Sequence, residues 1–136
     1  DRVTRQGDLS HYNSCNVLSL HALLGAYSDE GAQWLDELRP VLADNIRYAC
    51  DFIAAHFPGV QVMQPQGTYM LFLDCAAWLQ EHHMTLRELE ERGARAGVIW
   101  QDGAAFAWPD SIRMNLALPH SRLVEAMERL RKYAFC

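Results

Sequence analysis

The chain has 136 residues, half of them apolar and about a fifth charged, which is typical of one compact folded domain and excludes a disordered chain. Its 17 acidic and 12 basic side chains give a formal net charge of −5. This is the wrong sign for a protein that binds phosphate backbones, so we expect no nucleic acid partner. No apolar run approaches the roughly 18 residues that cross a bilayer, and the first thirty residues carry no basic stretch followed by an apolar signal core, so we expect neither a membrane nor a secretory protein.

The cysteines and lysines give two further indications. The cysteines are widely spaced and form no CxxC pair, which favours a cytoplasmic protein with reduced thiols, although a disulfide stays open. They are Cys15, Cys50, Cys75 and Cys136. The chain begins at Asp1 without a methionine, and Lys132 is its single lysine beside eleven arginines. We therefore expect this chain to be a fragment of a longer protein.

The first thirty residues predict a leading segment and one helix. Residues 1–13 are polar and aperiodic, which predicts a loose segment, and Asn13 or Ser14 is placed to cap the helix that follows. That helix is apolar on nearly every side, because it carries Val17, Leu18, Leu20, Ala22, Leu23, Leu24 and Tyr27. Such a helix is normally packed on two sides, so we expect part of its natural environment to lie outside this chain.

A long helix and two strands come next. Apolar residues at steps of three or four from Leu35 to Phe57 predict an amphipathic helix that Pro40 kinks or divides and Pro58-Gly59 ends. Residues 60–63 predict a strand. The continuous apolar run inside 68–74 predicts a second strand that is covered on both faces.

The C-terminal half predicts two helices and two strands. Thr85 and Glu88 have the spacing of a capping box for a helix that Gly97 ends. Residues 98–100 predict a short strand, 103–109 a loop, and the alternation over 111–118 a longer strand. Ser121 is placed to cap a terminal helix. This order predicts an α+β fold, a two-layer small domain with a small mixed or antiparallel sheet covered by helices.

The sequence predicts neither a metal site nor a nucleophilic cysteine. His82 and His83 are adjacent, so their side chains point apart and would need a third ligand from elsewhere. Ligand spacing is also missing for the remaining histidines, His11, His21, His56 and His120. The cysteines are expected to be small buried side chains.

Arg113 is the candidate substrate-binding residue. It lies in the middle of the 111–118 strand among apolar neighbours, on the same side as Asn115, and after a loop that contains Trp108. Its guanidinium can hold a carboxylate by two parallel charge-assisted hydrogen bonds. On the residues alone, a structural ion pair on a wet sheet face is the favoured alternative.

Several separated motifs resemble the C-terminal part of fold type I pyridoxal phosphate enzymes. The resemblance is closest to class I/II aminotransferases, in the cystathionine β-lyase-like branch of C–S lyases. It rests on 65–69 (PQGTY) with Asp74, on Gly103 and Phe106, and on 113–119 (RMNLALP). Further matches to the same branch are Ala26-Tyr27, the stretch 34–38 (WLDEL) and Asn45. In all it runs from about Asn16 to Tyr133.

This resemblance implies a role for each part of the chain. The arginine of the RxNxA stretch, here Arg113, would bind the α-carboxylate of an amino-acid substrate. Residues 1–30 would pack against a missing large domain that binds pyridoxal phosphate, and 31–136 would form the small C-terminal domain of an enzyme that is usually a homodimer. Tyr69 is a candidate for the mouth of the site. Residues 107–110 (AWPD) stand where the family usually has more glycine, which bears on substrate shape.

The resemblance places no catalytic and no cofactor-binding residue in this chain. Nothing around Lys132 indicates the desolvation that lowers a lysine pKa, so the lysine that forms the cofactor imine is expected before Asp1. The fragment alone is therefore expected to be inactive and to bind no cofactor.

Two questions stay open at this stage. Transamination and C–S β-elimination share the same cofactor and carboxylate anchor, so the sequence does not choose between them. A free-standing α+β regulatory module that binds a small carboxylate through Arg113 is the alternative, and a purely structural dimerisation domain is a third possibility.

Overall fold

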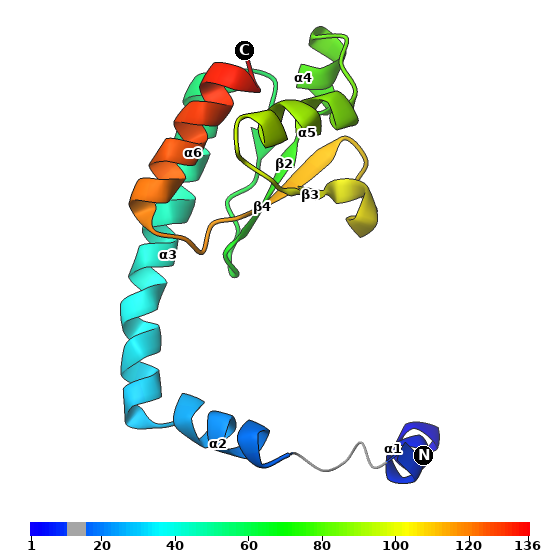
Figure 1. Cartoon of the computed structure of the whole chain (residues 1–136), viewed down its shortest axis with the longest axis vertical. Coiled ribbons are helices and arrows are strands. Elements are labelled where there is room, and N and C mark those ends of the chain that lie inside the picture. The colour runs from blue at the N-terminus through cyan, green and yellow to red at the C-terminus, as the bar shows by residue number, and fades with distance from the viewer. Residues whose placement is uncertain (11–15) are drawn as a thin grey trace. The chain divides into compact units, whose positions relative to one another are not determined.

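The chain forms two compact units, residues 1–39 and 40–136, in a computed structural model that describes residues 1–10 and 16–136. The first unit holds helix α1 (Arg2–Ser10), helix α2 (Val17–Ala26) and the beginning of helix α3 (Asp29–His56). The second holds the rest of α3, the sheet and the helices that cover it (Figure 1).

Helix α1 shows that the loose segment predicted for residues 1–13 is wrong over residues 2–10. The Asp1 carboxylate accepts a hydrogen bond from the backbone N–H of Val3 at 2.7 Å, so the chain starts with a side-chain cap that periodicity does not reveal. Residues 11–13 lie outside the described residues.

Helix α2 occupies the segment predicted as helical. Its cap is Asn16, whose side chain accepts a hydrogen bond from Ser19 N at 2.8 Å. The predicted caps Asn13 and Ser14 lie outside the described residues. Between 48% and 85% of the side chain is exposed at each large apolar residue of this segment, namely Val17, Leu18, Leu20, Leu23, Leu24 and Tyr27.

Helix α3 begins after Ser28, whose hydroxyl oxygen accepts a hydrogen bond from Gly31 N at 3.1 Å. It ends at His56, next to the Pro58-Gly59 pair that predicted its end. Pro40 lies inside the helix without ending it. The buried stripe begins after this proline and consists of Asn45, Ile46, Ala49, Phe52 and Ile53.

The sheet has four antiparallel strands in the order β1-β2-β4-β3. They are β1 (Gln61–Val62), β2 (Met70–Asp74), β3 (Gln101–Asp102) and β4 (Ser111–Asn115). The strand predicted at 98–100 is therefore displaced to 101–102, and the strand predicted over 111–118 stops at Asn115. Of the two predicted arrangements, mixed and antiparallel, the antiparallel one is confirmed.

Register divides the sheet into a core face and an open face. Leu71 lies opposite Met114 and Leu73 opposite Ile112, and all four side chains are buried on the core face. Met70, Phe72 and Arg113 alternate with them and therefore lie on the open face, where each is half-buried. The prediction that β2 is covered on both faces is wrong, because the helices bury one face only.

Helices cover the core face and complete the α+β two-layer fold. Besides α3 they are α4 (Ala76–Glu81), which the sequence did not predict, α5 (Leu86–Arg95) and α6 (His120–Tyr133), which begins after Pro119 rather than after Ser121. Their contribution to the core comes from Trp78, Leu79, Leu89, Leu123, Met127 and Leu130. Each fully buried side chain of this size contributes about 1.5–3 kcal/mol.

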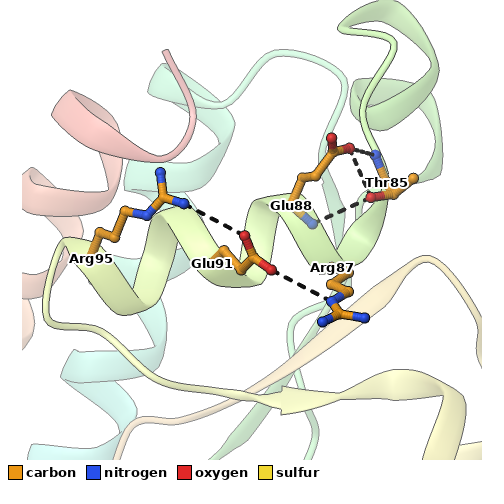
Figure 2. Close-up of polar contacts among 5 residues, drawn as sticks. All are labelled: Thr85, Arg87, Glu88, Glu91 and Arg95. Carbon is orange, nitrogen blue, oxygen red and sulfur yellow. Dashed lines mark hydrogen bonds and ion pairs between the residues drawn. The ribbon is translucent and has the colours of Figure 1, made fainter.

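The capping box predicted for α5 is confirmed (Figure 2). Thr85 Oγ1 accepts from Glu88 N at 3.3 Å, and Thr85 N donates to the Glu88 carboxylate at 2.8 Å. This backbone hydrogen bond is the main cause that lowers the pKa of Glu88. Gly97, at φ +80°, follows the end of the helix in the left-handed conformation that glycine adopts most readily.

Of the helices in the described ranges, none is both long and apolar enough to cross a membrane.

Candidate functional site

Arg113 lies in the middle of β4 on the open face, between two neighbouring strands. Phe72 of β2 is its register partner on one side, and Gln101 of β3 on the other. Directly paired residues of an antiparallel sheet project from the same face, so all three side chains belong to the open face. The alternation predicted over 111–118, of which the strand covers 111–115, therefore placed Arg113 on the correct face.

Two kinds of contact hold the Arg113 guanidinium. Its Nη1 donates a hydrogen bond to Oε1 of Gln101 at 2.5 Å. Its Cζ lies 4.6 Å from the ring centroid of Phe106, in the 3₁₀ helix η1 (Gly103–Phe106), and 6.0 Å from that of Phe72. These are cation–π distances, so the charge rests on aromatic surface while one edge of the guanidinium is fixed by an amide.

The structure argues against the ion-pair alternative for Arg113. Over residues 1–10 and 16–136, the ion pairs of arginine involve other arginines, and no carboxylate lies within ion-pair distance of Arg113. A guanidinium has five N–H donors. A half-buried cation with one neutral hydrogen-bond partner keeps donors and charge available for an anion.

A groove of about 670 Å³ runs over the open face from Arg113 towards β1. Phe72 and Met70 lie along it, and Gln61 and Gln64 line it further from Arg113. Trp108 forms part of its lining, with its ring stacked on that of Phe72 at 6.2 Å and 17°. Asp74 of β2 also lines the groove, so its lining is apolar, amide and acidic. A cation beside such a groove is suited to a small molecule that carries a carboxylate and a side chain.

The loop that carries Trp108 has two residues in the left-handed region. Ala107 and Asp110 both have φ +60°, a conformation that glycine adopts more easily. The loop is nevertheless tied down, because Trp108 N donates to Gly103 O at 3.1 Å and the buried Ser111 hydroxyl donates to Trp108 O at 2.7 Å. A Cβ on Gly103 would collide with Ser111 Oγ, which explains the glycine at that position.

Gln101 is the site residue that the sequence analysis missed. Its strand has only two residues, too short for an alternating pattern, and the pairing that puts it beside Arg113 joins residues twelve positions apart. Tyr69 precedes β2 with 44% of its side chain exposed and is not among the residues that line the groove.

His82 and His120 have structural contacts of their own. The ring of His82 stacks on that of Trp78 at 4.1 Å, and its Nδ1 lies 2.8 Å from the Trp78 carbonyl oxygen. The ring of His120 contacts that of Tyr48, and its Nδ1 lies 3.0 Å from Oδ1 of Asn45. His11 lies outside the described residues. Within those residues, no three His, Cys, Asp or Glu side chains are grouped so that they could hold a metal ion.

The described cysteines, Cys50, Cys75 and Cys136, are unpaired. Burial is the main cause that raises the pKa of the Cys75 thiol to about 12, and Asp74 and Asp110 add to it. Burial likewise raises the pKa of Cys50. Thiols that stay protonated at neutral pH are poor nucleophiles. The prediction of buried side chains is confirmed for Cys75, whereas Cys50 is half-buried and the prediction is wrong for Cys136, which is exposed. Cys15 lies outside the described residues.

Comparison with known proteins gives one family. Residues 6–130 match the family model described as aminotransferase class I and II. The chain is 33% identical over 122 residues to the protein MalY of Escherichia coli, covering 87% of this chain and 30% of MalY. It is 35% identical over 131 residues to a cystathionine beta-lyase of Corynebacterium glutamicum, covering 94% of this chain and 31% of that protein. The chain thus spans about 30% of the length of the curated relatives it matches.

Solved structures give the same result. A putative aminotransferase from Clostridium difficile 630, crystallised with bound pyridoxal phosphate, is 31% identical and superposes with a TM-score of 0.78 over 89% of this chain and 30% of its own. Cystalysin from Treponema denticola, which contains the same cofactor, is 29% identical with a TM-score of 0.68 over 79% of this chain and 27% of its own.

The single lysine of this chain does not fit the role that pyridoxal phosphate requires of a lysine. The cofactor's aldehyde is held as an imine by a lysine whose amine must lose its proton. Lys132, the single lysine, is fully exposed, and a hydrogen bond with Tyr133 raises the pKa of its ammonium. A cation stabilised in solvent is the opposite of what the imine requires, so Lys132 is unsuited to that role.

Proposed function

Because the chain belongs to the aminotransferase class I and II family, we propose that it supplies the carboxylate-binding side of the substrate site in a pyridoxal phosphate-dependent enzyme that acts on amino acids. In this proposal Arg113 binds the α-carboxylate. The reaction is transamination or β-elimination at a C–S bond, the activity class of the relatives named as cystathionine beta-lyases.

One observation carries the proposal, namely a half-buried guanidinium without an ion-pair partner in the described part of the chain, at the end of a groove. A carboxylate held by two parallel N–H···O bonds has a fixed orientation as well as a favourable charge interaction. Orientation matters in amino-acid chemistry, because holding the carboxylate decides which bond to the α-carbon faces the reactive group. Arg113 acts by binding and orienting, and it takes no proton.

Pyridoxal phosphate supplies the electron sink for this chemistry, and we propose that it is held by residues outside this chain. The lysine, the partner of the pyridine nitrogen and the phosphate site would then belong to a large domain. We propose that residues 1–30, with the exposed apolar side chains of α2, pack against that domain, and that 31–136 form the small domain. We further propose a homodimer in the cytoplasm, where unpaired thiols such as those of the described cysteines persist.

The test is the substitution Arg113→Met in the complete protein. Losing a bidentate charge-assisted contact is expected to raise KM for the amino-acid substrate by on the order of 100-fold, with a smaller effect on kcat. The matched control is Arg87→Met, which removes an arginine on α5 whose side chain is 87% exposed and paired with Glu91. We expect KM to be unchanged in this control. An unchanged KM in Arg113→Met would leave the arginine without a substrate role.

A further inference from the structure

Gln101 is the hydrogen-bond partner of Arg113, and its chemistry differs from that of the usual partner. An arginine on a sheet face is commonly held by a carboxylate, which neutralises it. The acceptor here is an uncharged amide oxygen, 2.5 Å from Nη1. The guanidinium is thus fixed in orientation without losing its net charge.

Topology places Gln101 on the side of Arg113 away from the groove. In the order β1-β2-β4-β3, the groove extends from β4 over β2 towards β1, whereas Gln101 projects from β3 on the opposite flank. Gln101 is therefore able to hold the guanidinium without occupying the space of a ligand. Because Gln101 takes up one N–H of Nη1, Nε and Nη2 remain as a pair of parallel donors for a carboxylate.

Phe106 restricts the remaining freedom of the guanidinium. Its ring centroid lies 4.6 Å from Cζ, so the planar cation rests on an aromatic face while the amide fixes its rotation within that plane. A free arginine side chain populates many rotamers, and contacts made before binding reduce the rotamer entropy that is lost when the ligand binds.

We infer that Gln101 is a positioning residue for carboxylate recognition, which orients Arg113 through its neutral amide and leaves the positive charge to the ligand. This inference rests on the proposed function of Arg113. In this role Gln101 affects only the binding of the carboxylate, through Arg113, and does not contact the substrate.

The experiment compares two probes that differ by a carboxylate. The dissociation constants of L-alanine and of ethylamine, which is alanine without its carboxylate, are measured for the complete protein by titration calorimetry. Their ratio is the carboxylate preference. A change that merely perturbs the fold affects both probes, whereas loss of positioning affects L-alanine only.

Two substitutions at Gln101 separate orientation from charge. Gln101→Met keeps the length of the side chain but removes the acceptor, and we expect the carboxylate preference to fall about fivefold. Gln101→Glu keeps the shape and adds a negative charge that pairs with Arg113, and we expect a fall of tenfold or more. Gln80→Glu adds the same charge at an exposed position on α4 and is expected to leave the preference unchanged.

Arg113→Met makes the outcomes distinguishable. If it abolishes the preference while both Gln101 variants retain it, the positioning role is overturned and the proposed function stands. If the unmodified protein has no preference for L-alanine over ethylamine, both are overturned. A loss of preference in all three variants, with ethylamine binding unchanged, supports the inference.

Discussion

The two faces of the small sheet are built from alternate residues of the same strands, yet they carry different chemistry. On the core face Leu71, Leu73 and Ile112 are fully buried beneath helices. On the open face Phe72 and Arg113, each next in sequence to one of these residues, stay half-buried and border a groove. The buried core and the candidate site are therefore formed by alternate residues of the same strands rather than by separate parts of the chain.

This difference explains why apolar side chains on the open face are left partly exposed. Met70 and Phe72 of β2 project towards the groove, where they give a ligand an apolar surface. The partial exposure of these apolar side chains costs folding free energy, which burial on the core face offsets. Such an exception to the burial of apolar residues is expected at a functional site.

The largest expected effect comes from the pair Leu73→Ala and Phe72→Ala. Leu73 is fully buried, so its truncation is expected to lower the free energy of unfolding by about 3 kcal/mol, through lost burial and a cavity. Phe72→Ala is expected to cost less stability but to weaken L-alanine binding, because its ring flanks Arg113 and stacks on Trp108. Urea unfolding and calorimetric titration of the complete protein measure the two effects. Equal loss of binding in both variants would contradict the separation of the faces.

A smaller effect is expected at Asn45, the buried polar residue of α3. Its Nδ2 donates to the carbonyl oxygens of Leu116 and Leu118, both at 2.9 Å, and so fixes the chain between β4 and α6. Asn45→Ala removes the side-chain donor to both carbonyls, although Leu116 O keeps its hydrogen bond from Leu118 N, and is expected to lower the free energy of unfolding by about 2 kcal/mol. Its exposed neighbour gives the control, since Asp44→Ala should change stability by less than about 0.5 kcal/mol. A stability equal to that of the control would show that the amide does not hold this connection.

The smallest of these effects is expected at the capping box of α5. Thr85→Ala removes the side chain that accepts from Glu88 N, with an expected loss of about 1 kcal/mol, while Thr85→Ser keeps the hydroxyl and should lose less. Because the pKa of Glu88 is lowered in the folded state, its contribution is present above the ordinary value of 4.5 and is lost as the pH falls through the lowered value. After the backbone hydrogen bond, the Thr85 hydroxyl is the next cause that lowers the pKa of Glu88, because it donates to the same carboxylate at 2.8 Å. Thr85→Ala removes this part of the contribution and keeps the backbone hydrogen bond, so the difference between Thr85→Ala and the unmodified protein should shrink in acid. Urea unfolding at pH 7 and at pH 3 checks this, and a difference that grows in acid would contradict it.

Short-range patterns predicted much of this fold. The alternation over 111–118 placed Arg113 on its face, although the strand ends at Asn115, and the Thr85 and Glu88 spacing located α5. Both signals are local, since they depend on residues within one element. The burial of one face of β2 and the two-residue strand β3 depend on tertiary pairing, and a continuous apolar run such as 69–73 does not say which side the helices cover.

The residues of the candidate site also divide into those with a local sequence signal and those that depend on tertiary pairing. Arg113 attracted attention because a charge inside an apolar alternating strand stands out, and the resemblance then supplied its substrate role. Phe106 was named only as part of that resemblance, and Gln101 was missed, because nothing local distinguishes a glutamine that faces an arginine across a strand pair from one that faces solvent. Whether Arg113 is the carboxylate anchor stays a prediction until the substitutions above are made.

The two left-handed residues on either side of Trp108 have a consequence for selectivity. Ala107 and Asp110 are both at φ +60°, and two hydrogen bonds anchor the backbone of Trp108. The indole is therefore positioned before a ligand binds. A glycine-rich loop would adjust to ligands of many shapes, whereas this loop presents a rigid surface. In the function proposed above, this loop would select ligands by their shape, and a bulky side chain would be excluded by the rigidity of the loop rather than by its charge.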